Sequence, residues 1–296
     1  MVDDGRPPDT APAPAAPGHR HGPGPGGTAA DPDGYLLDNR LDGADLRLAA
    51  IAALFDPVTF RHLAATGVGE GWRCWEVGAG GPTVSAWLAD VVGPTGSVVA
   101  TDVDLTRFGP TPTGVEALVH DVTADPPPGA AFDLIHARLV LVHLPARSEV
   151  VATLAAALRP GGWLVLEDAD PALQPLACLD ETGPDEVLAN RVRSGFRTLL
   201  AKRGADLAFG RSLPRLLRGA ALVDVTADAW FPVAGPIGAV LERVTVEQTR
   251  DALEAAGLAT AAEVDRYLAV LAAGRVDLAT APLVSASGRR GERRDA

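Results

Sequence analysis

A short apolar stretch that ends in an acid and then in glycines is the part of the chain best suited to hold a ligand: Trp72-Arg73-Cys74-Trp75-Glu76-Val77-Gly78-Ala79-Gly80-Gly81. The residues up to Val77 predict a buried strand, and Gly78 and Gly80 allow a tight turn that brings bare backbone against a ligand. Pro82 and the apolar spacing of residues 84–89 predict a helix directly afterwards. A strand, a glycine turn and a helix amino terminus together predict a nucleotide-type pocket in an α/β sheet.

Three of the strands predicted after this turn end in acids. These are residues 96–102, which end in Asp102, residues 115–121, which end in Asp121, and residues 163–168, which end in Glu167 and Asp168. Ligands of parallel sheets bind at the carboxyl ends of the strands. We therefore expect these acids to lie along the same edge as the glycine turn.

The remaining elements alternate between strands and helices. Further strands are predicted over 131–137, 221–230 and 282–286, and helices over 44–63 (one or two, broken at Pro57), 150–158, 186–200, 212–217, 237–257 and 261–273. This alternation predicts a doubly wound, mostly parallel seven-stranded α/β sheet with helices on both faces.

Composition divides the chain further. Residues 1–30 are rich in Pro and Gly and cannot bury enough apolar surface to offset their ordering entropy, so they are predicted to be a disordered tail. The other predicted parts are an amino-terminal helical cap at 31–70, an α/β domain at 71–288 with helical insertions near 171–220 and 237–273, and a disordered tail at 289–296.

Two classes of cofactor suit such an edge. A dinucleotide site favours a third glycine where this chain has Thr83, and Glu76 would lie unfavourably beside a pyrophosphate. S-adenosylmethionine has no phosphate and carries positive charge that an acid such as Glu76 tolerates. Asp102 could accept hydrogen bonds from its ribose hydroxyls, and Asp121 one from its adenine amino group. The pattern favours S-adenosylmethionine.

The motifs, taken in order, resemble those of the class I S-adenosylmethionine-dependent methyltransferases. Residues 76–80 look like the first motif of this family, 102–104 like its second-strand acid and 120–122 like its adenine contact, while 132–144 and 158–164 resemble later motifs of small-molecule members of the ubiquinone/menaquinone type and of bacterial natural-product pathways. The resemblance covers about 35–288 and implies a Rossmann-like fold with a helical lid. It also implies a cofactor site lined by Glu76, Gly78, Ala79, Gly80, Asp102, Val103, Asp121, Val122 and Arg138. The proline-rich segment between Asp121 and Phe132 is too short for the usual helix, so we expect different cover for the adenine pocket.

Methyl transfer needs a base only if the acceptor must lose a proton. His143 is the first candidate and Glu167 or Asp168 the next, although a packing histidine and a helix cap are equally natural interpretations of these positions. Tyr35, just ahead of the first helices, is either a substrate-binding residue that covers the pocket or a surface anchor.

Three functions remain open at this level. The first is methyl transfer to an O, C or N atom of a small-molecule acceptor in bacterial secondary metabolism. The second is a step without methylation, such as cyclisation or hydroxylation, on the same cofactor-binding fold. The third is an NAD(P)-dependent oxidoreductase, which Thr83 and Glu76 disfavour.

Charge and composition limit the partners. A net charge of -12 argues against nucleic acid, which usually needs a cationic face. The basic cluster Arg289, Arg290, Arg293 and Arg294 is predicted to lie in a loose tail. The chain has two cysteines, no metal-ligand spacing and no recognisable signal peptide, and we expect no apolar run of transmembrane length. We therefore expect a cytoplasmic enzyme without a metal and without membrane insertion. The helices of 44–63 could cap their own pocket or that of a neighbour in a homodimer.

Overall fold

A computed structural model describes residues 43–144 and 146–292. Its strands are β1 (Arg73–Val77), β2 (Ser97–Asp102), β3 (Val115–Val119), β4 (Phe132–Arg138), β5 (Leu158–Ala169), β6 (Leu222–Trp230) and β7 (Leu283–Arg290). Its α-helices are α1 (Ala44–Ala65), α2 (Thr83–Val92), α3 (Arg147–Ala157), α4 (Pro184–Lys202), α5 (Leu213–Gly219), α6 (Pro236–Ala255) and α7 (Ala261–Ala272), with short 3-10 turns η1 (Leu141–His143) and η2 (Gly210–Ser212).

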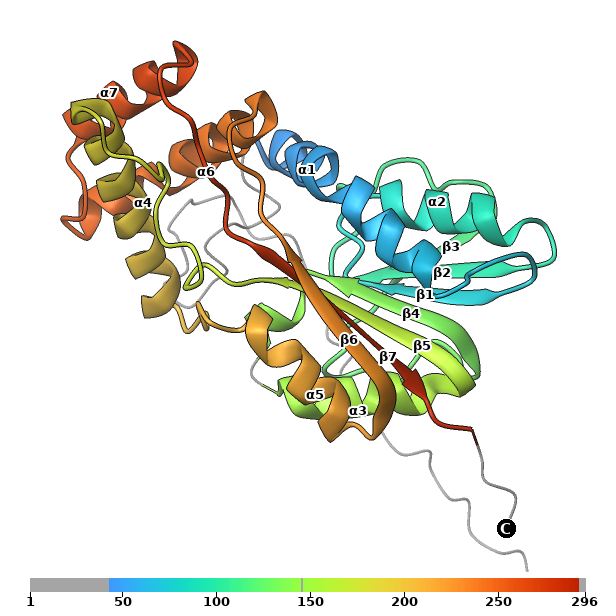
Figure 1. The fold of residues 1–296 in the computed structure, drawn as a ribbon. Coiled ribbons are helices and arrows are strands. Elements are labelled where there is room, and N and C mark those ends of the chain that lie inside the picture. The colour runs from blue at the N-terminus through green and yellow to red at the C-terminus, as the bar shows by residue number, and fades with distance from the viewer. Residues whose placement is uncertain (1–42, 145, 293–296) are drawn as a thin grey trace, which may run out of the picture. The chain divides into compact units, whose positions relative to one another are not determined.

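The strands form one sheet in the order β3-β2-β1-β4-β5-β7-β6 (Figure 1). Strands β1 to β5 pair in parallel, and β7 runs antiparallel to both β5 and β6. In the β1–β2 and β1–β4 pairings Val77 lies opposite Thr101 and Ala137, so the carboxyl ends of three neighbouring strands meet at one edge. The predicted doubly wound, mostly parallel seven-stranded sheet is confirmed.

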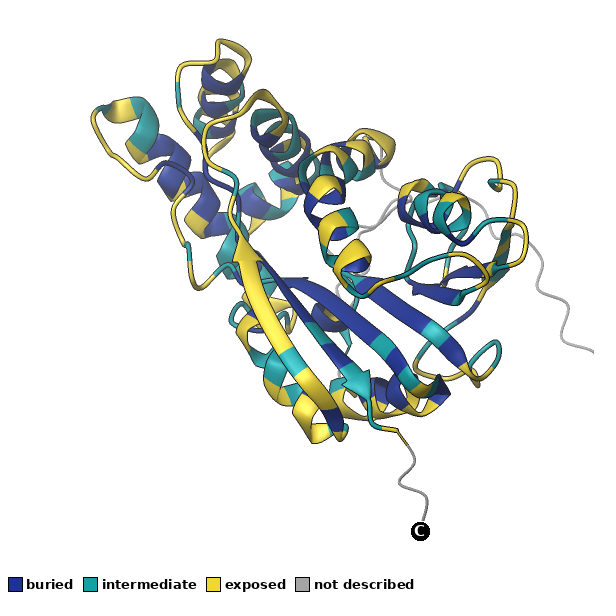
Figure 2. Ribbon diagram, turned by 45° about the vertical axis from the view of Figure 1, so that its right-hand side comes forward, coloured by how far each residue is buried: buried dark blue, intermediate teal, exposed yellow. Residues whose placement is uncertain are grey.

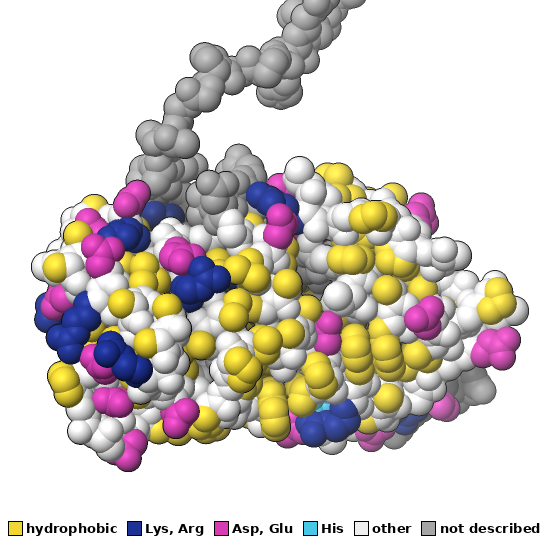
Figure 3. All heavy atoms as spheres, turned by 90° about the horizontal axis from the view of Figure 1, so that it is seen from above, with side chains coloured by type: hydrophobic (Ala, Val, Ile, Leu, Met, Phe, Trp, Pro, Cys, Tyr) yellow, Lys and Arg dark blue, Asp and Glu magenta, His cyan; other side chains and the backbone are white. Residues whose placement is uncertain are grey.

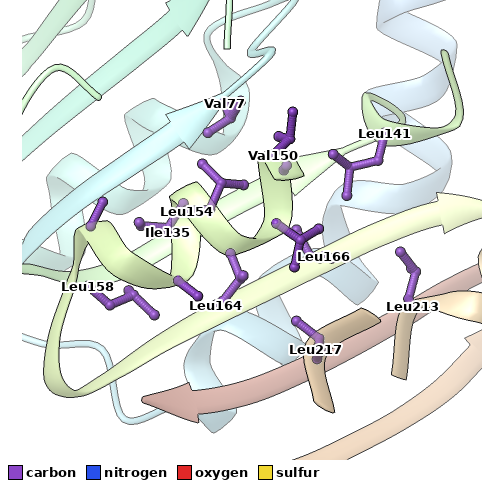
Figure 4. Packing of buried hydrophobic residues seen from close by; sticks show 14 of the residues in the cluster. Val77, Ile135, Leu141, Val150, Leu154, Leu158, Leu164, Leu166, Leu213 and Leu217 are labelled. Atoms are coloured by element: carbon purple, nitrogen blue, oxygen red, sulfur yellow. The ribbon is translucent and has the colours of Figure 1, made fainter. Parts of the chain in front are cut away.

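One face of the sheet is covered by α3 and α5. Figure 4 shows Val150 and Leu154 of α3 and Leu217 of α5 close to strand residues such as Ile135 and Leu166. Successive strand residues point to opposite faces, so Trp75 and Val77 join this cluster while Cys74 joins the cluster on the other face. The largest of the three buried clusters in the described chain therefore includes residues of β1, the strand that leads into the glycine turn, and holds this strand in place.

The opposite face is covered by α1 and α2, which pack Leu63 and Leu88 against the sheet. The sequence predicted a break at Pro57, but α1 runs without interruption from Ala44 to Ala65. Proline removes one backbone hydrogen bond from a helix interior. Tertiary contacts on both sides of Pro57 compensate, because the amino-terminal half packs on α6 and the carboxyl-terminal half docks on the sheet.

α4, α6 and α7 form a separate helical bundle with its own buried cluster. Within it Arg193 donates to Glu242 Oε2 at 2.5 Å, and the Tyr267 hydroxyl donates to Glu242 Oε1 at 2.9 Å. Figure 3 shows basic and acidic side chains interspersed over the end of the molecule that this bundle forms. The predicted helical insertion at 171–220 contains two helices that pack in different places. α4 belongs to the bundle, whereas α5 packs on the sheet.

The carboxyl-terminal strands differ from their predicted bounds. β5 begins at Leu158 and not at the predicted residue 163, and its first residues show a register shift opposite residues 132–134. β7 continues to Arg290, where Arg289 pairs with Asp224, so these two arginines are part of the sheet and not of a loose tail. Figure 2 shows β6 as an exposed strand at the border of the sheet. Alternation of residue types identified these strands, but sheet pairing set their ends.

Length and composition alone would allow α1 to cross a membrane, so the expectation that no apolar run reaches that length is wrong. The contacts of α1 are those of a core helix in a folded domain. Its polar residues Asp56, Thr59 and His62 contact polar groups of the sheet, and Leu63 is fully buried in the cluster beneath.

Candidate functional site

The glycine turn joins β1 to α2 with left-handed backbone at Gly78 (φ 65°) and Gly80 (φ 61°). A Cβ atom on Gly78 would lie 2.3 Å from Cγ2 of Val140, so no side chain fits between the turn and the segment after β4. That segment is itself strained, because Leu139 has a φ of 57°, a conformation that side chains rarely adopt. Close packing and backbone strain thus coincide at the carboxyl edge of β1 and β4.

Asp102 ends β2 and binds the turn directly. Its Oδ2 accepts a hydrogen bond from Gly80 N at 2.8 Å, and its Oδ1 accepts one from Asp104 N at 3.1 Å. An ionised carboxylate offers about four acceptor positions, so each oxygen keeps capacity for a ligand. The neighbouring Val103 is 67% exposed and presents an apolar surface beside this acid.

Asp121 follows β3 and begins a loop that leads to Phe132 without a helix, as the short proline-rich spacing predicted. Its Oδ1 accepts hydrogen bonds from Thr123 N (2.8 Å) and Thr123 Oγ1 (2.6 Å), which lower the pKa of this carboxyl. Val122 is half-buried and packs against the large cluster. Val119, the last residue of β3, pairs with Asp102, so Asp121 and Val122 follow at the carboxyl end of the third strand.

Glu76 lies on the α1 and α2 side of β1 and is 4% exposed. Its Oε2 has no hydrogen-bond partner. Burial raises the pKa of Glu76 to about 8; Arg138 opposes this rise, while the nearby carboxylates of Asp56 and Asp102 add to it. A carboxyl group in these surroundings holds its proton at neutral pH.

Arg138, which the resemblance places in the cofactor site, makes its ion pair and its side-chain hydrogen bond with α1. Its guanidinium lies 2.8 Å from Asp56 Oδ1 and donates to Thr59 Oγ1 at 2.9 Å, both on α1. Side chains on strands alternate between faces, and this residue points to the face that α1 covers. Its observed contacts tie α1 to β4.

His143 lies in the η1 turn beyond β4, and part of its surface is exposed. Desolvation lowers its pKa to about 4, with further contributions from the positive charges of Arg147 and Arg47. The imidazole is therefore neutral at physiological pH.

Asp168 lies behind His143 and is 1% exposed. Its Oδ2 accepts a hydrogen bond from Val142 N at 3.0 Å, and desolvation raises the pKa of this carboxyl to about 7. Arg147 holds the other side of the same turn by donating to the carbonyl oxygens of Leu141 (3.0 Å) and Val142 (2.8 Å). These contacts make Asp168 a support for the turn that carries His143, and they do not favour its predicted role as a base.

Glu167 lies on the opposite face, beneath α1, and is 1% exposed. It accepts hydrogen bonds from Thr59 and from Ser285 Oγ (2.6 Å), and its Oε1 lies 3.1 Å from His62 Nδ1. Desolvation would raise its pKa, but His136, whose Nε2 lies 3.5 Å from Oε2, and His62 hold the pKa well below its usual range. A carboxylate enclosed in this way is a docking point for α1, and these contacts do not favour the predicted catalytic role of Glu167.

Sequence reasoning missed the docking residues on α1. Asp56, Thr59 and His62 recur every three residues on a mostly apolar helix, and this polar stripe is the signal that could have revealed them. Tyr35 lies outside the described residues. Among the residues that the structure describes, no group of three or more His, Cys, Asp or Glu could hold a metal ion.

The comparisons with known proteins agree with this geometry. The family model of a methyltransferase domain matches residues 47–262. The chain belongs to this methyltransferase family. Among curated relatives of the family, methyltransferase str3 of Strobilurus tenacellus is 30% identical over 186 residues, which cover 61% of this chain and 62% of the relative. Methyltransferase GfsG of Streptomyces halstedii is 30% identical over 146 residues, which cover 47% and 49%. The chain thus spans less than two thirds of the length of each.

Solved methyltransferase structures are also similar. A putative methyltransferase from Bacillus halodurans C-125 is 18% identical, with 77% of this chain and 96% of that one covered and a TM-score of 0.48. Haemonchus contortus phosphoethanolamine N-methyltransferase 2, in complex with phosphomonomethylethanolamine and S-adenosylhomocysteine, is 13% identical, with 83% and 52% covered and a TM-score of 0.47.

The cofactor of this methyltransferase family is S-adenosylmethionine, and the residues present fit it. Asp102 ends β2 beside the glycine turn, a Cβ on Gly81 of that turn would meet no atom within 4 Å, and the unpartnered Oε2 of Glu76 suits a positively charged ligand. The predicted recognition of a class I methyltransferase with this cofactor is confirmed.

Proposed function

We propose that the protein transfers the methyl group of S-adenosylmethionine to a small-molecule acceptor. The observation that carries this proposal is the hydrogen bond from Gly80 N to Asp102 Oδ2, which brings the glycine turn and the acid of β2 together at the edge where α/β sheets bind ligands. Asp102 would hold the ribose, and Val103, Asp121 and Val122 would contact the adenine.

The cofactor supplies an already activated methyl group, so the protein has to bind, align and exclude water. His143 is the group that we assign to an acceptor proton, because this exposed imidazole lies in the turn after β4. An acceptor with a phenol, alcohol or acidic carbon would lose its proton to this ring. The likeness of residues 132–144 and 158–164 to small-molecule methyltransferases supports an acceptor from secondary metabolism.

Calorimetric titration with S-adenosylmethionine, S-adenosylhomocysteine and NADH tests the binding part of the proposal. We expect both sulfur ligands to bind and NADH not to bind, with Asp102→Ala at least tenfold weaker and Asp90→Ala, an exposed carboxylate of α2, unchanged. Binding of NADH alone would overturn the proposal.

Product mass tests the chemistry. Incubation with aromatic and polyketide-like acceptors should give a gain of one methyl group, whereas an unchanged or rearranged mass would favour a step without methylation on the same fold. Normal turnover by His143→Ala would remove His143 from the proposed role.

A further inference from the structure

Glu76 shares a buried corner with charged groups from three other elements. Asp56 comes from α1, Asp102 from β2 and Arg138 from β4, while Ser85 of α2 supplies a hydroxyl. Glu76 is 4% exposed, and Asp56 and Asp102 are each 9% exposed. Among the described groups that face Glu76, three carboxyl groups therefore stand against one guanidinium, and that guanidinium lies 2.8 Å from Asp56. With all three carboxyl groups ionised, the single positive charge of Arg138 would leave these four groups with a net negative charge.

Two carboxyl oxygens of this corner lack a hydrogen-bond partner, Asp56 Oδ1 and Glu76 Oε2, but Asp56 Oδ1 lies 2.8 Å from the guanidinium of Arg138. The Oε2 atom of Glu76 is buried and has no hydrogen-bond partner. An ionised carboxylate buried without a partner is strongly unfavourable, and a carboxyl group avoids this state by keeping its proton. Burial accordingly raises its pKa to about 8, although Arg138 acts in the opposite direction.

The cofactor of the family brings the missing charge. S-adenosylmethionine carries a sulfonium and an ammonium against one carboxylate, whereas S-adenosylhomocysteine lacks the sulfonium charge. Glu76 lies two residues before Gly78, at the strand end where the turn begins. We propose that Glu76 is a proton-linked counter-ion of the cofactor, protonated in the empty site and ionised when the positive charge of S-adenosylmethionine arrives.

In this exchange the O–H bond of the carboxyl group breaks, the proton passes to solvent and the electron pair stays on the carboxylate. The inference rests on the proposed function, because it needs S-adenosylmethionine to bind at the glycine turn. It also gives a reason for product release: once the methyl group has left, the sulfonium charge is gone, Glu76 regains its proton and the attraction weakens.

A first measurement needs no ligand. We compare the melting temperatures of the wild-type protein and Glu76→Gln from about pH 5 to about pH 9. A carboxyl with a raised pKa loses stability as pH rises from its unfolded value to about 8, whereas Gln is uncharged throughout. The melting temperature of Glu76→Gln should therefore rise relative to that of wild type as pH rises. Glu116→Gln, at an exposed glutamate of β3, should show no such trend. A pH-independent difference for Glu76→Gln would overturn the inference.

The second measurement counts protons during binding. Calorimetric titration near neutral pH, in two buffers of different ionisation enthalpy, should show release of up to one proton with S-adenosylmethionine and less with S-adenosylhomocysteine. The affinity of wild type for S-adenosylmethionine should weaken by up to about tenfold for each pH unit below about 8, relative to Glu76→Gln. The amino group of the ligand also titrates, but it contributes equally to both proteins, so their difference isolates Glu76.

The outcomes separate the two proposals. Binding of S-adenosylmethionine with equal proton release by wild type and Glu76→Gln would overturn the linkage and leave the proposed function intact. Failure of both sulfur ligands to bind would overturn the proposed function and the linkage with it.

Discussion

Gly78 is the residue at which the turn allows least change. Replacement by Ala would add a Cβ 2.3 Å from Val140 in a backbone conformation that side chains avoid. Strain and overpacking together predict a loss of about 2–4 kcal/mol in unfolding free energy and loss of S-adenosylhomocysteine binding. Urea denaturation and calorimetry measure both.

Gly81→Ala is the matched control for this change, because its Cβ would meet no atom within 4 Å. Equal stability and affinity of Gly78→Ala and Gly81→Ala would contradict the account of the turn.

His143 predicts a pH dependence. Its pKa is lowered to about 4 in the folded protein, so between about pH 6.5 and about pH 4 the unfolded chain binds a proton that the folded chain does not. This group therefore destabilises the fold as pH falls below about 6.5. The melting temperature of His143→Gln should fall less on acidification than that of wild type. Scanning fluorimetry at several pH values measures this difference. A parallel decline of both proteins would show that the ring is not desolvated.

At the level of single residues, the sequence identified the ends of the cofactor edge but not the partners of each acid. Glycines and acids at strand ends follow from strand pattern, because parallel strands end together. Glu167 points to the acceptor side or to α1 according to the face of the sheet on which its side chain lies. The sequence predicts the fifth strand but not which of its residues lie on which face. Alternation separates Glu167 from Asp168 only once Leu164 and Leu166 are known to face α3 and α5.

At the level of elements, the docking of α1 on the sheet depends on Glu167. Removing one partner of a buried ionic network leaves the others unpaired, so Glu167→Ala should cost about 3–5 kcal/mol in unfolding free energy. Ser285→Ala, which removes one hydrogen bond from the same carboxylate, should cost about 1 kcal/mol. Chemical denaturation of both variants provides the comparison, and equal losses would mean that the network carries no stability beyond that bond.

The continuity of α1 shows why this element was predicted imperfectly. Proline is a valid local signal for a helix break, but here contacts made by residues far apart in sequence outweigh it. Contacts between distant residues also decide the end of β7. Its extension to Arg290 depends on pairing with β5 and β6 and not on its own residue types.

At the level of the whole molecule, ligand binding should stabilise the fold that builds the edge. S-adenosylhomocysteine at about 100 times its dissociation constant adds about 2.7 kcal/mol, which corresponds to a rise of about 5–10 °C in melting temperature for a domain of this size. Thermal shift assays of wild type and Asp102→Ala would measure it. No shift at saturating ligand would indicate that the glycine turn does not form a binding site in the folded protein.

The contacts that hold α1 also constrain how the chain can fold. Glu167 lies 108 residues after Thr59 in the chain, and Ser285 a further 118 residues after Glu167. A helix that leaves the ribosome early therefore waits, with its apolar side uncovered, until strands from the middle and the far part of the sequence have been made. During that interval α1 resembles a segment that chaperones and membrane-insertion machinery recognise. Additional holdase chaperone should accordingly raise the yield of soluble protein, whereas slower translation, which prolongs this interval, should lower it.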